Sequence, residues 1–145
     1  MELSCKSQYA ILALLELAVH YHEDEPRQSR QIAEQYNIPD RYLEQLLATL
    51  RRGGLVRSQR GAKGGYFLAK EPWTITLLDI LVCVEGTDVY KIDENTAPQT
   101  LETAAVLDIW QEVHQSATAI LKKYTLKDLC EKLDAQRQVN LMYYI

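Results

Sequence analysis

The hydrophobic pattern between residues 29 and 52 predicts two short helices joined by a turn. Behind Ser29, a candidate N-cap, apolar residues recur at helical spacing as far as Tyr36. The pattern breaks at Asn37 and Pro39, and Pro39 suits the first turn of a following helix. That second helix has one apolar face, formed by Leu43, Leu46, Leu47 and Leu50.

A hairpin is predicted directly after the second helix. Gly53 and Gly54 end the helix, residues 55–58 and 65–69 read as strands, and residues 59–64 form a loop rich in glycine and charge. Glycine lets the tip of such a loop lie close to another backbone or a groove. Two helices followed by a glycine-tipped basic hairpin are typical of a winged helix-turn-helix that grips DNA.

The chain before this unit is also helical in pattern. Residues 4–21 carry apolar side chains at steps of three and four, namely Tyr9, Leu12, Leu15 and Val19. We interpret this helix as scaffold, with Lys6 reaching a DNA phosphate.

After the hairpin, the pattern predicts a short helix and then a loop. Thr76, with Asp79 three residues later, forms a capping box for a helix over residues 77–85, which Gly86 closes. Residues 87–98 have no period and several turn formers, so we expect an exposed loop.

The pattern over about residues 99–124 is that of a coiled coil. Its apolar residues alternate at steps of four and three: Val106, Trp110, Val113, Ala117, Ile120 and Tyr124. Two interpretations are open, an amphipathic helix on the chain's own core or a protruding dimer helix. We favour the dimer helix because the chain already has enough helix to cover the winged core, and a two-fold reader of DNA needs an isologous contact.

A last helix closes the predicted fold. Thr125 with Asp128 caps it, and we expect it to run through Leu133. The tail, residues 139–145 (VNLMYYI), is too apolar to stay in solvent, so we expect it to dock on the body or on a partner chain.

These elements predict a mostly α fold with a small β-hairpin wing. Residues 1–86 are the winged helix-turn-helix domain, residues 87–98 a sensory-type loop, and residues 99–145 the dimerisation helix, the C-terminal helix and the docked tail. A chain of 145 residues can bury one good core. It has no apolar run of membrane length and no signal-peptide pattern, so we expect a cytoplasmic protein without a membrane partner.

Charge placement supports a DNA partner better than total charge does. The net charge of −4 argues against nucleic acid when taken alone. Residues 41–70, however, hold one acidic residue, Glu44, against a basic set of Arg41, Arg51, Arg52, Arg57, Arg60, Lys63 and Lys70. Phosphate neutralisation needs only such a local basic face.

No motif favours an enzyme. The sequence has no pairing of nucleophile and base, no phosphate loop and no HExxH spacing, and the glycines of GAKGG lie in a hairpin rather than between a strand and a helix. The three cysteines, Cys5, Cys83 and Cys130, form no CxxC unit and no disulfide framework.

Three segments resemble the Rrf2-type winged-helix regulators of bacteria, a family that includes iron-sulfur cluster regulators and repressors of cysteine metabolism. They are KSQYAILALLELA near the start, IPDRYLEQLLATLRRGGLVRSQRGAKGGYFLA in the middle, and TLKDL after the long helix. The resemblance implies a homodimeric transcription factor whose recognition helix enters the major groove of double-stranded DNA and whose wing reaches the minor groove.

The resemblance also implies which residues contact DNA. The family's base-reading positions fall on Asp40, Arg41, Tyr42, Glu44 and Gln45. Glu44 is alternatively a solvated acid on the helix face. Arg60 matches the wing arginine, which suits a narrow minor groove, and Lys63 adds a phosphate contact. Arg51 and Arg52 are phosphate contacts or ordinary surface charges.

The chain departs from the cluster-binding members of the family. Those members resemble one another in three cysteines before the dimer helix, and residues 84–129 here contain none. Gln8 stands where some members have a further ligand, and Leu107 where a histidine is expected. Thiolates hold such clusters, so we predict no cofactor. Low-ranked metal candidates are Cys5, Cys83, Cys130 and His114, the last of which has a packing or surface role as its alternative.

Three functional readings therefore remain open. The favoured one is a DNA-binding dimer controlled by a protein partner or small metabolite near residues 88–98. The second is the same regulator with a non-standard cluster held by the dispersed cysteines. The third is a protein-interaction module that does not read DNA.

Overall fold

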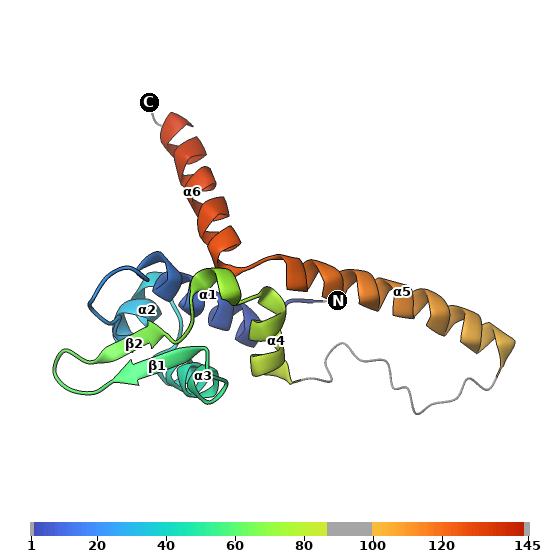
Figure 1. Cartoon of the computed structure of the whole chain (residues 1–145), viewed down its shortest axis with the longest axis horizontal. Coiled ribbons are helices and arrows are strands. Elements are labelled where there is room, and N and C mark those ends of the chain that lie inside the picture. The colour runs from blue at the N-terminus through green and yellow to red at the C-terminus, as the bar shows by residue number, and fades with distance from the viewer. Residues whose placement is uncertain (1, 87–99, 144–145) are drawn as a thin grey trace.

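The computed structural model describes residues 2–86 and 100–143 (Figure 1). A compact body carries two projecting helices, α5 and α6, which leave it in different directions (Figure 1). The elements in chain order are α1 (Cys5–Val19), α2 (Ser29–Tyr36), α3 (Asp40–Arg52), β1 (Val56–Gln59), β2 (Gly65–Leu68), the 3₁₀ turn η1 (Pro72–Thr74), α4 (Leu77–Glu85), α5 (Leu101–Lys123) and α6 (Leu126–Tyr143). The predicted fold class, mostly helical with a two-stranded hairpin, is confirmed.

Helix α1 forms the centre of the body, but its buried face differs from the predicted one. Its buried positions are mostly small residues and leucines, with one acid among them: Ser7, Ala10, Ala13, Leu14, Glu16, Leu17 and Ala18. The predicted stripe is only half-buried at Tyr9, Leu12 and Leu15, and Val19 is exposed. Alanines let the neighbouring α3, α4 and α6 approach closely, so the large side chains lie at the edges of the contact.

The helix-turn-helix is formed by α2 and α3. The leucine face of α3 is buried as predicted. Asn37 has a left-handed backbone (φ 54°), which ends α2, and Ile38 N–H donates to the carbonyl of Ala33 at 3.0 Å. The predicted N-cap is wrong by one residue: Gln28 precedes the helix, and its N–H donates to Oε1 of Gln31 at 2.9 Å.

The wing is an antiparallel hairpin of β1 and β2, in which Val56 lies opposite Leu68. A third segment pairs with its free edge, because Arg27 forms an isolated antiparallel bridge with Tyr66. The wing is therefore attached both to the end of α3 and to the loop before α2.

The capping box of Thr76 and Asp79 is confirmed at the start of α4, and Gly86 ends that helix with φ 92°. Helices α4 and α6 begin side by side, since Thr76 and Thr125 form an antiparallel bridge. The predicted loop over residues 87–98 lies outside the described residues.

One prediction for the C-terminal half is wrong: helix α6 continues to Tyr143 rather than ending at Leu133. Residues 139–143 are its exposed last turns and do not dock on the body, with Tyr143 85% exposed; docking of this tail on a partner chain stays a prediction. Over Leu101–Lys123, helix α5 has no buried residue, which agrees with a projecting helix better than with one lying on the core. Among the described helices, none has the length and apolarity needed to cross a membrane.

Candidate nucleic-acid interface

The outward face of α3 is the first part of the candidate interface. Burial of the leucine face on the core turns the opposite face to solvent, and Asp40, Arg41, Glu44 and Gln45 are all exposed there. Asp40 lies in the first turn, where an acid favours the positive end of the helix dipole. Tyr42 differs, because it is half-buried.

Tyr42 packs against the body as well as facing outward. Its ring meets that of Tyr9 edge to face, with centroids 5.7 Å apart and planes at 80°. Such a contact fixes the ring, so Tyr42 connects the scaffold helix α1 with the candidate recognition helix.

The tip of the wing presents the second part. Arg60 and Lys63 are both exposed, on a turn that Gly64 N–H closes by donating to the carbonyl of Gly61 at 2.9 Å. Gly61 has φ 111°, a backbone conformation that residues other than glycine rarely adopt. The glycines at the tip thus fold the loop tightly while its two basic side chains project into solvent.

Three arginines near the base of the wing make contacts with other side chains of the same chain. The Arg57 guanidinium lies 4.3 Å from the centre of the Phe67 ring, and Arg51 Nη1 lies 3.4 Å from Oγ of Ser58. Arg52 donates to the hydroxyl of Thr49 at 3.3 Å. Arg51 thereby joins the end of α3 to β1 and keeps further N–H groups for another partner.

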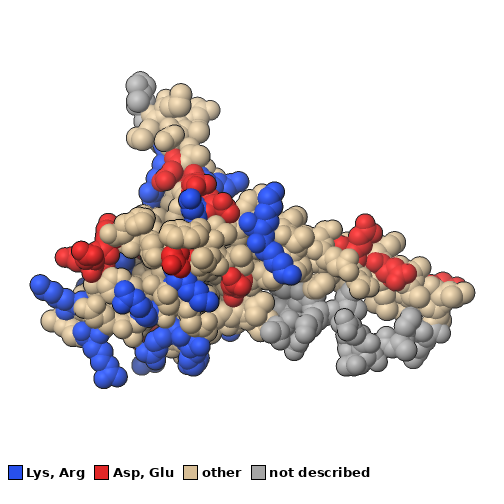
Figure 2. All heavy atoms as spheres, viewed as in Figure 1, with Lys and Arg blue, Asp and Glu red and all other residues tan. Residues whose placement is uncertain are grey.

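The charges are unevenly spread on the surface in the view of Figure 2. Lys and Arg without neighbouring acids gather along the lower left edge, over the wing and α3, while acidic and basic residues mix on α6 and acidic ones lie along α5 (Figure 2). Lys6 lies at the start of α1. Its charge is a lesser cause of the low pKa of Glu85, after the hydrogen bonds that Glu85 accepts from Ser4 and Ser7.

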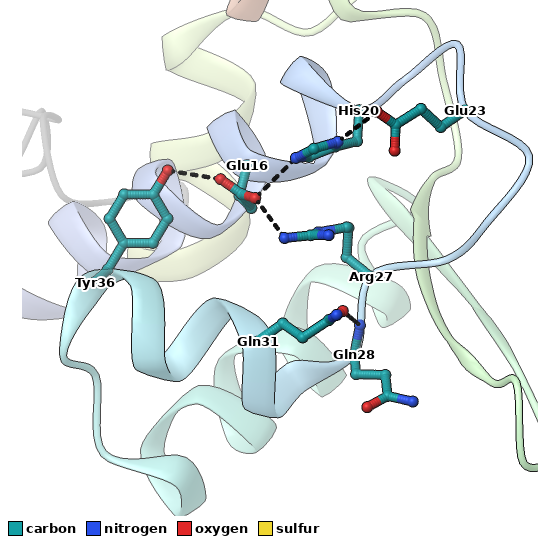
Figure 3. Close-up of polar contacts among 7 residues, drawn as sticks. All are labelled: Glu16, His20, Glu23, Arg27, Gln28, Gln31 and Tyr36. Atoms are coloured by element: carbon teal, nitrogen blue, oxygen red, sulfur yellow. Dashed lines mark hydrogen bonds and ion pairs between the residues drawn. The ribbon is translucent and has the colours of Figure 1, made fainter.

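A buried polar network behind the wing was missed by sequence reasoning. Glu16 of α1 is 5% exposed and lies among three partners: Arg27 Nη2, His20 Nε2 and the Tyr36 hydroxyl, each 3.0 Å away (Figure 3). His20 Nδ1 also lies 2.8 Å from Glu23. The sequence signals were an acid inside the apolar run ILALLELAV and a histidine, His20, four residues after it.

Burial and the bond to Glu16 affect the ionisation of Tyr36. Desolvation first, and then donation to the Glu16 carboxylate, raise the pKa of Tyr36 to about 12. The phenol therefore stays protonated and keeps its hydrogen bond over the physiological range.

The cysteines do not fit an iron-sulfur cluster within one chain. Over residues 2–86 and 100–143, no three His, Cys, Asp or Glu side chains form a group that could hold a metal. Cys83 donates to the carbonyl of Thr49 at 3.6 Å, and burial raises the pKa of both Cys83 and Cys130, which disfavours the thiolate that iron needs. Cys5 is exposed at the start of α1, and His114 lies half-buried on α5.

The predicted dimer stripe is solvent-exposed in the single chain. Trp110 is 56% exposed, and Val106, Val113, Ile120 and Tyr124 are exposed with it, while Ala117 is half-buried. Leu107 and Leu121, which do not belong to the stripe, are half-buried on α5.

Comparisons with known proteins agree with this architecture. A model of the family described as Rrf2, iron-dependent transcriptional regulator, matches residues 3–132. The HTH-type transcriptional regulator CymR of Bacillus subtilis is 34% identical over 144 residues, which are 99% of either chain.

Two solved structures are similar over nearly the whole chain. That of CymR, the global cysteine regulator of B. subtilis, has a TM-score of 0.77 at 34% identity and covers 91% of this chain and 98% of its own. That of IscR from T. potens also has a TM-score of 0.77, at 35% identity, with 94% and 91% covered.

Proposed function

The chain belongs to the Rrf2 family of bacterial transcriptional regulators, which are not enzymes, and on this premise we propose that it is a homodimeric, sequence-specific DNA-binding protein. Helix α3 enters the major groove, and the tip of the wing reaches the adjacent minor groove. Base edges are read by Asp40, Arg41, Tyr42, Glu44 and Gln45.

The observation that carries this proposal is the basic surface shared by α3 and the wing. Lys and Arg gather there in Figure 2, and the exposed residues of these two elements include Arg41 on α3 and Arg60 and Lys63 on the wing tip. An arginine suits the negative potential of a narrow minor groove, and lysine suits phosphate. Arg51 and Lys6 add phosphate contacts from the flanks.

Dimerisation is proposed from the exposed stripe of α5. A row of six apolar residues at heptad spacing, none fully buried by its own chain, is costly to leave in water. A second copy would cover it through a two-fold contact and would place two recognition helices on one duplex.

We further propose that this regulator lacks the usual three-cysteine cluster. Its control would then come from a protein or small metabolite near residues 88–98, which lie outside the described residues. The raised pKa values of Cys83 and Cys130 support this choice.

DNA binding is tested with a pool of duplexes of random sequence. We expect the protein to retain a subset of the pool. Arg60→Ala with Lys63→Ala should weaken binding to a retained duplex. The log–log salt slope should become shallower by about one, since Lys63 is the phosphate contact of the pair and each such contact contributes about 0.9. The matched control is Lys127→Ala with Lys132→Ala on α6, which removes the same charge away from the wing.

Two outcomes would contradict the proposal. Unchanged affinity and slope in the wing-tip variant would mean that the wing does not grip DNA. Retention of no duplex at all would favour the protein-interaction module instead.

A further inference from the structure

We propose that Glu16 and Arg27 are positioning residues for DNA binding: the buried carboxylate holds the loop segment to which the wing is attached, and so fixes the wing relative to α3. This inference rests on the proposed function, because it assigns a role within the DNA-binding surface. Neither side chain needs to touch DNA.

Glu16 is buried and needs partners for its charge. A carboxylate withdrawn from water is destabilising unless it is paired and hydrogen-bonded. Oε1 of Glu16 lies 3.0 Å from both Arg27 Nη2 and His20 Nε2, and Oε2 accepts from Tyr36 at 3.0 Å (Figure 3). Both oxygens are therefore occupied, and the network joins α1 to the two ends of α2.

The main chain of Arg27 pairs with the wing. Its N–H donates to the carbonyl of Tyr66 at 3.1 Å, and Tyr66 N–H donates to the carbonyl of Arg27 at 2.8 Å. The backbones approach so closely at Gly65 that an added Cβ there would lie 2.6 Å from the Arg27 carbonyl oxygen. Arg27 thus binds Glu16 by its side chain and the wing by its backbone.

The position of the wing tip depends on how the base of the hairpin is attached. Arg60 and Lys63 lie beyond the paired part of the hairpin, so a small rotation at its base moves them furthest. Two attachments set that rotation, the end of α3 and the bridge to Arg27. Without the ion pair to Glu16, Arg27 would be less firmly placed and its main-chain bridge to Tyr66 would loosen. The wing tip would then lose its fixed position relative to α3.

The test measures the affinity of Glu16→Gln for a duplex retained from the random pool. The variant keeps the shape of the side chain but removes its charge. We expect affinity to fall about tenfold, the middle of the range for coupled neighbours. In the background of Arg60→Ala with Lys63→Ala, Glu16→Gln should lower affinity by less than about twofold. The tip then has no basic side chains left to misplace. Glu34→Gln, an exposed glutamate on α2, is the matched control and should leave affinity unchanged.

Amide hydrogen exchange supplies a second readout. Glu16→Gln should speed exchange at the Arg27 and Tyr66 amides while leaving the amides of the core leucines of α3 unchanged. A general loss of stability would speed both sets. Should Glu16→Gln fail to fold, Arg27→Lys replaces it, since it keeps the charge and the backbone bridge but loses the fork that reaches Glu16.

The possible failures are distinguishable. Equal losses of affinity with and without the wing tip, or unchanged affinity and exchange, would overturn the positioning role. If the wing-tip variant alone bound DNA as tightly as the natural protein, the proposed function would fail instead.

Discussion

At the scale of single residues, the sulfur of Cys83 decides what position 53 can hold. The backbone of Gly53 has φ −78° and ψ −2°, which any residue can adopt. A Cβ added there would nevertheless run into Sγ of Cys83. Any larger residue therefore forces the Cys83 side chain to move, at the place where α3 ends against α4.

Gly53→Ala should lower the free energy of unfolding by about 1–3 kcal/mol, the usual cost of overpacking. In the background of Cys83→Ala the same change should be neutral or stabilising by up to about 1 kcal/mol, since alanine reduces the freedom of the unfolded chain. Urea unfolding of the four proteins measures both. An equal loss in the two backgrounds would show that Cys83 is not the obstacle.

Tyr36 gives a pH dependence of stability. Its pKa is about 12 in the folded chain, against about 10 when unfolded. Between these values the folded state holds the proton and the unfolded state has released it, so this contribution is complete below pH about 10 and is lost as pH rises toward 12.

Tyr36→Phe should therefore be less stable than the natural protein near neutral pH, where Glu16 loses a donor. The difference in unfolding free energy between the two proteins should shrink as pH rises from about 10 to about 12. Urea unfolding at several pH values checks this, and the comparison cancels the other tyrosines. A constant difference would show that Tyr36 ionises normally.

At the scale of elements, α5 both contacts the body and exposes an apolar stripe. The helix lies against α4, and the heptad stripe faces solvent. The stripe is therefore available to another chain.

Trp110→Asp should convert a dimer into a monomer, because a charge would be buried at the centre of the stripe. Sedimentation over a range of concentrations measures the change. Gln115→Asp is the control, since Gln115 is exposed on the opposite side of α5 and should leave the dimer intact. A natural protein that is monomeric at all concentrations would refute the stripe as an interface.

The elements that could be predicted from sequence are those with local signals. The capping box of Thr76 and the glycines after α3 fixed helix ends to within a residue or two, because the atoms that satisfy them are near in sequence. The end of α6 had no such signal. Its last turns are exposed, so hydrophobic periodicity could not mark them, and the apolar tail VNLMYYI was interpreted as a separate segment.

The candidate interface was predictable only in part. The leucine face of α3 determined which side chains point outward, and the resemblance to the family supplied their roles. The role of Glu16 was missed because Arg27 and Tyr36 reach it from other segments of the chain, and those contacts depend on tertiary structure. The i,i+4 spacing of Glu16 and His20 is a local signal, but it does not name the two distant partners.

At the scale of the whole molecule, cysteine placement governs metal binding. Residues 84–129 contain no cysteine, and burial raises the pKa of the thiols of Cys83 and Cys130, which disfavours the thiolate. Protein purified without oxygen should therefore be colourless and hold no stoichiometric iron. An absorption spectrum with an iron assay measures this. A brown protein with stoichiometric iron would reverse the conclusion and direct attention to the cysteines across a dimer.

The attachment of the wing to Arg27 uses main-chain atoms on both sides. The side chains of Arg60 and Lys63 take no part in this attachment. Their replacement should therefore leave the scaffold intact as long as Gly61, with its positive φ, keeps the turn in place.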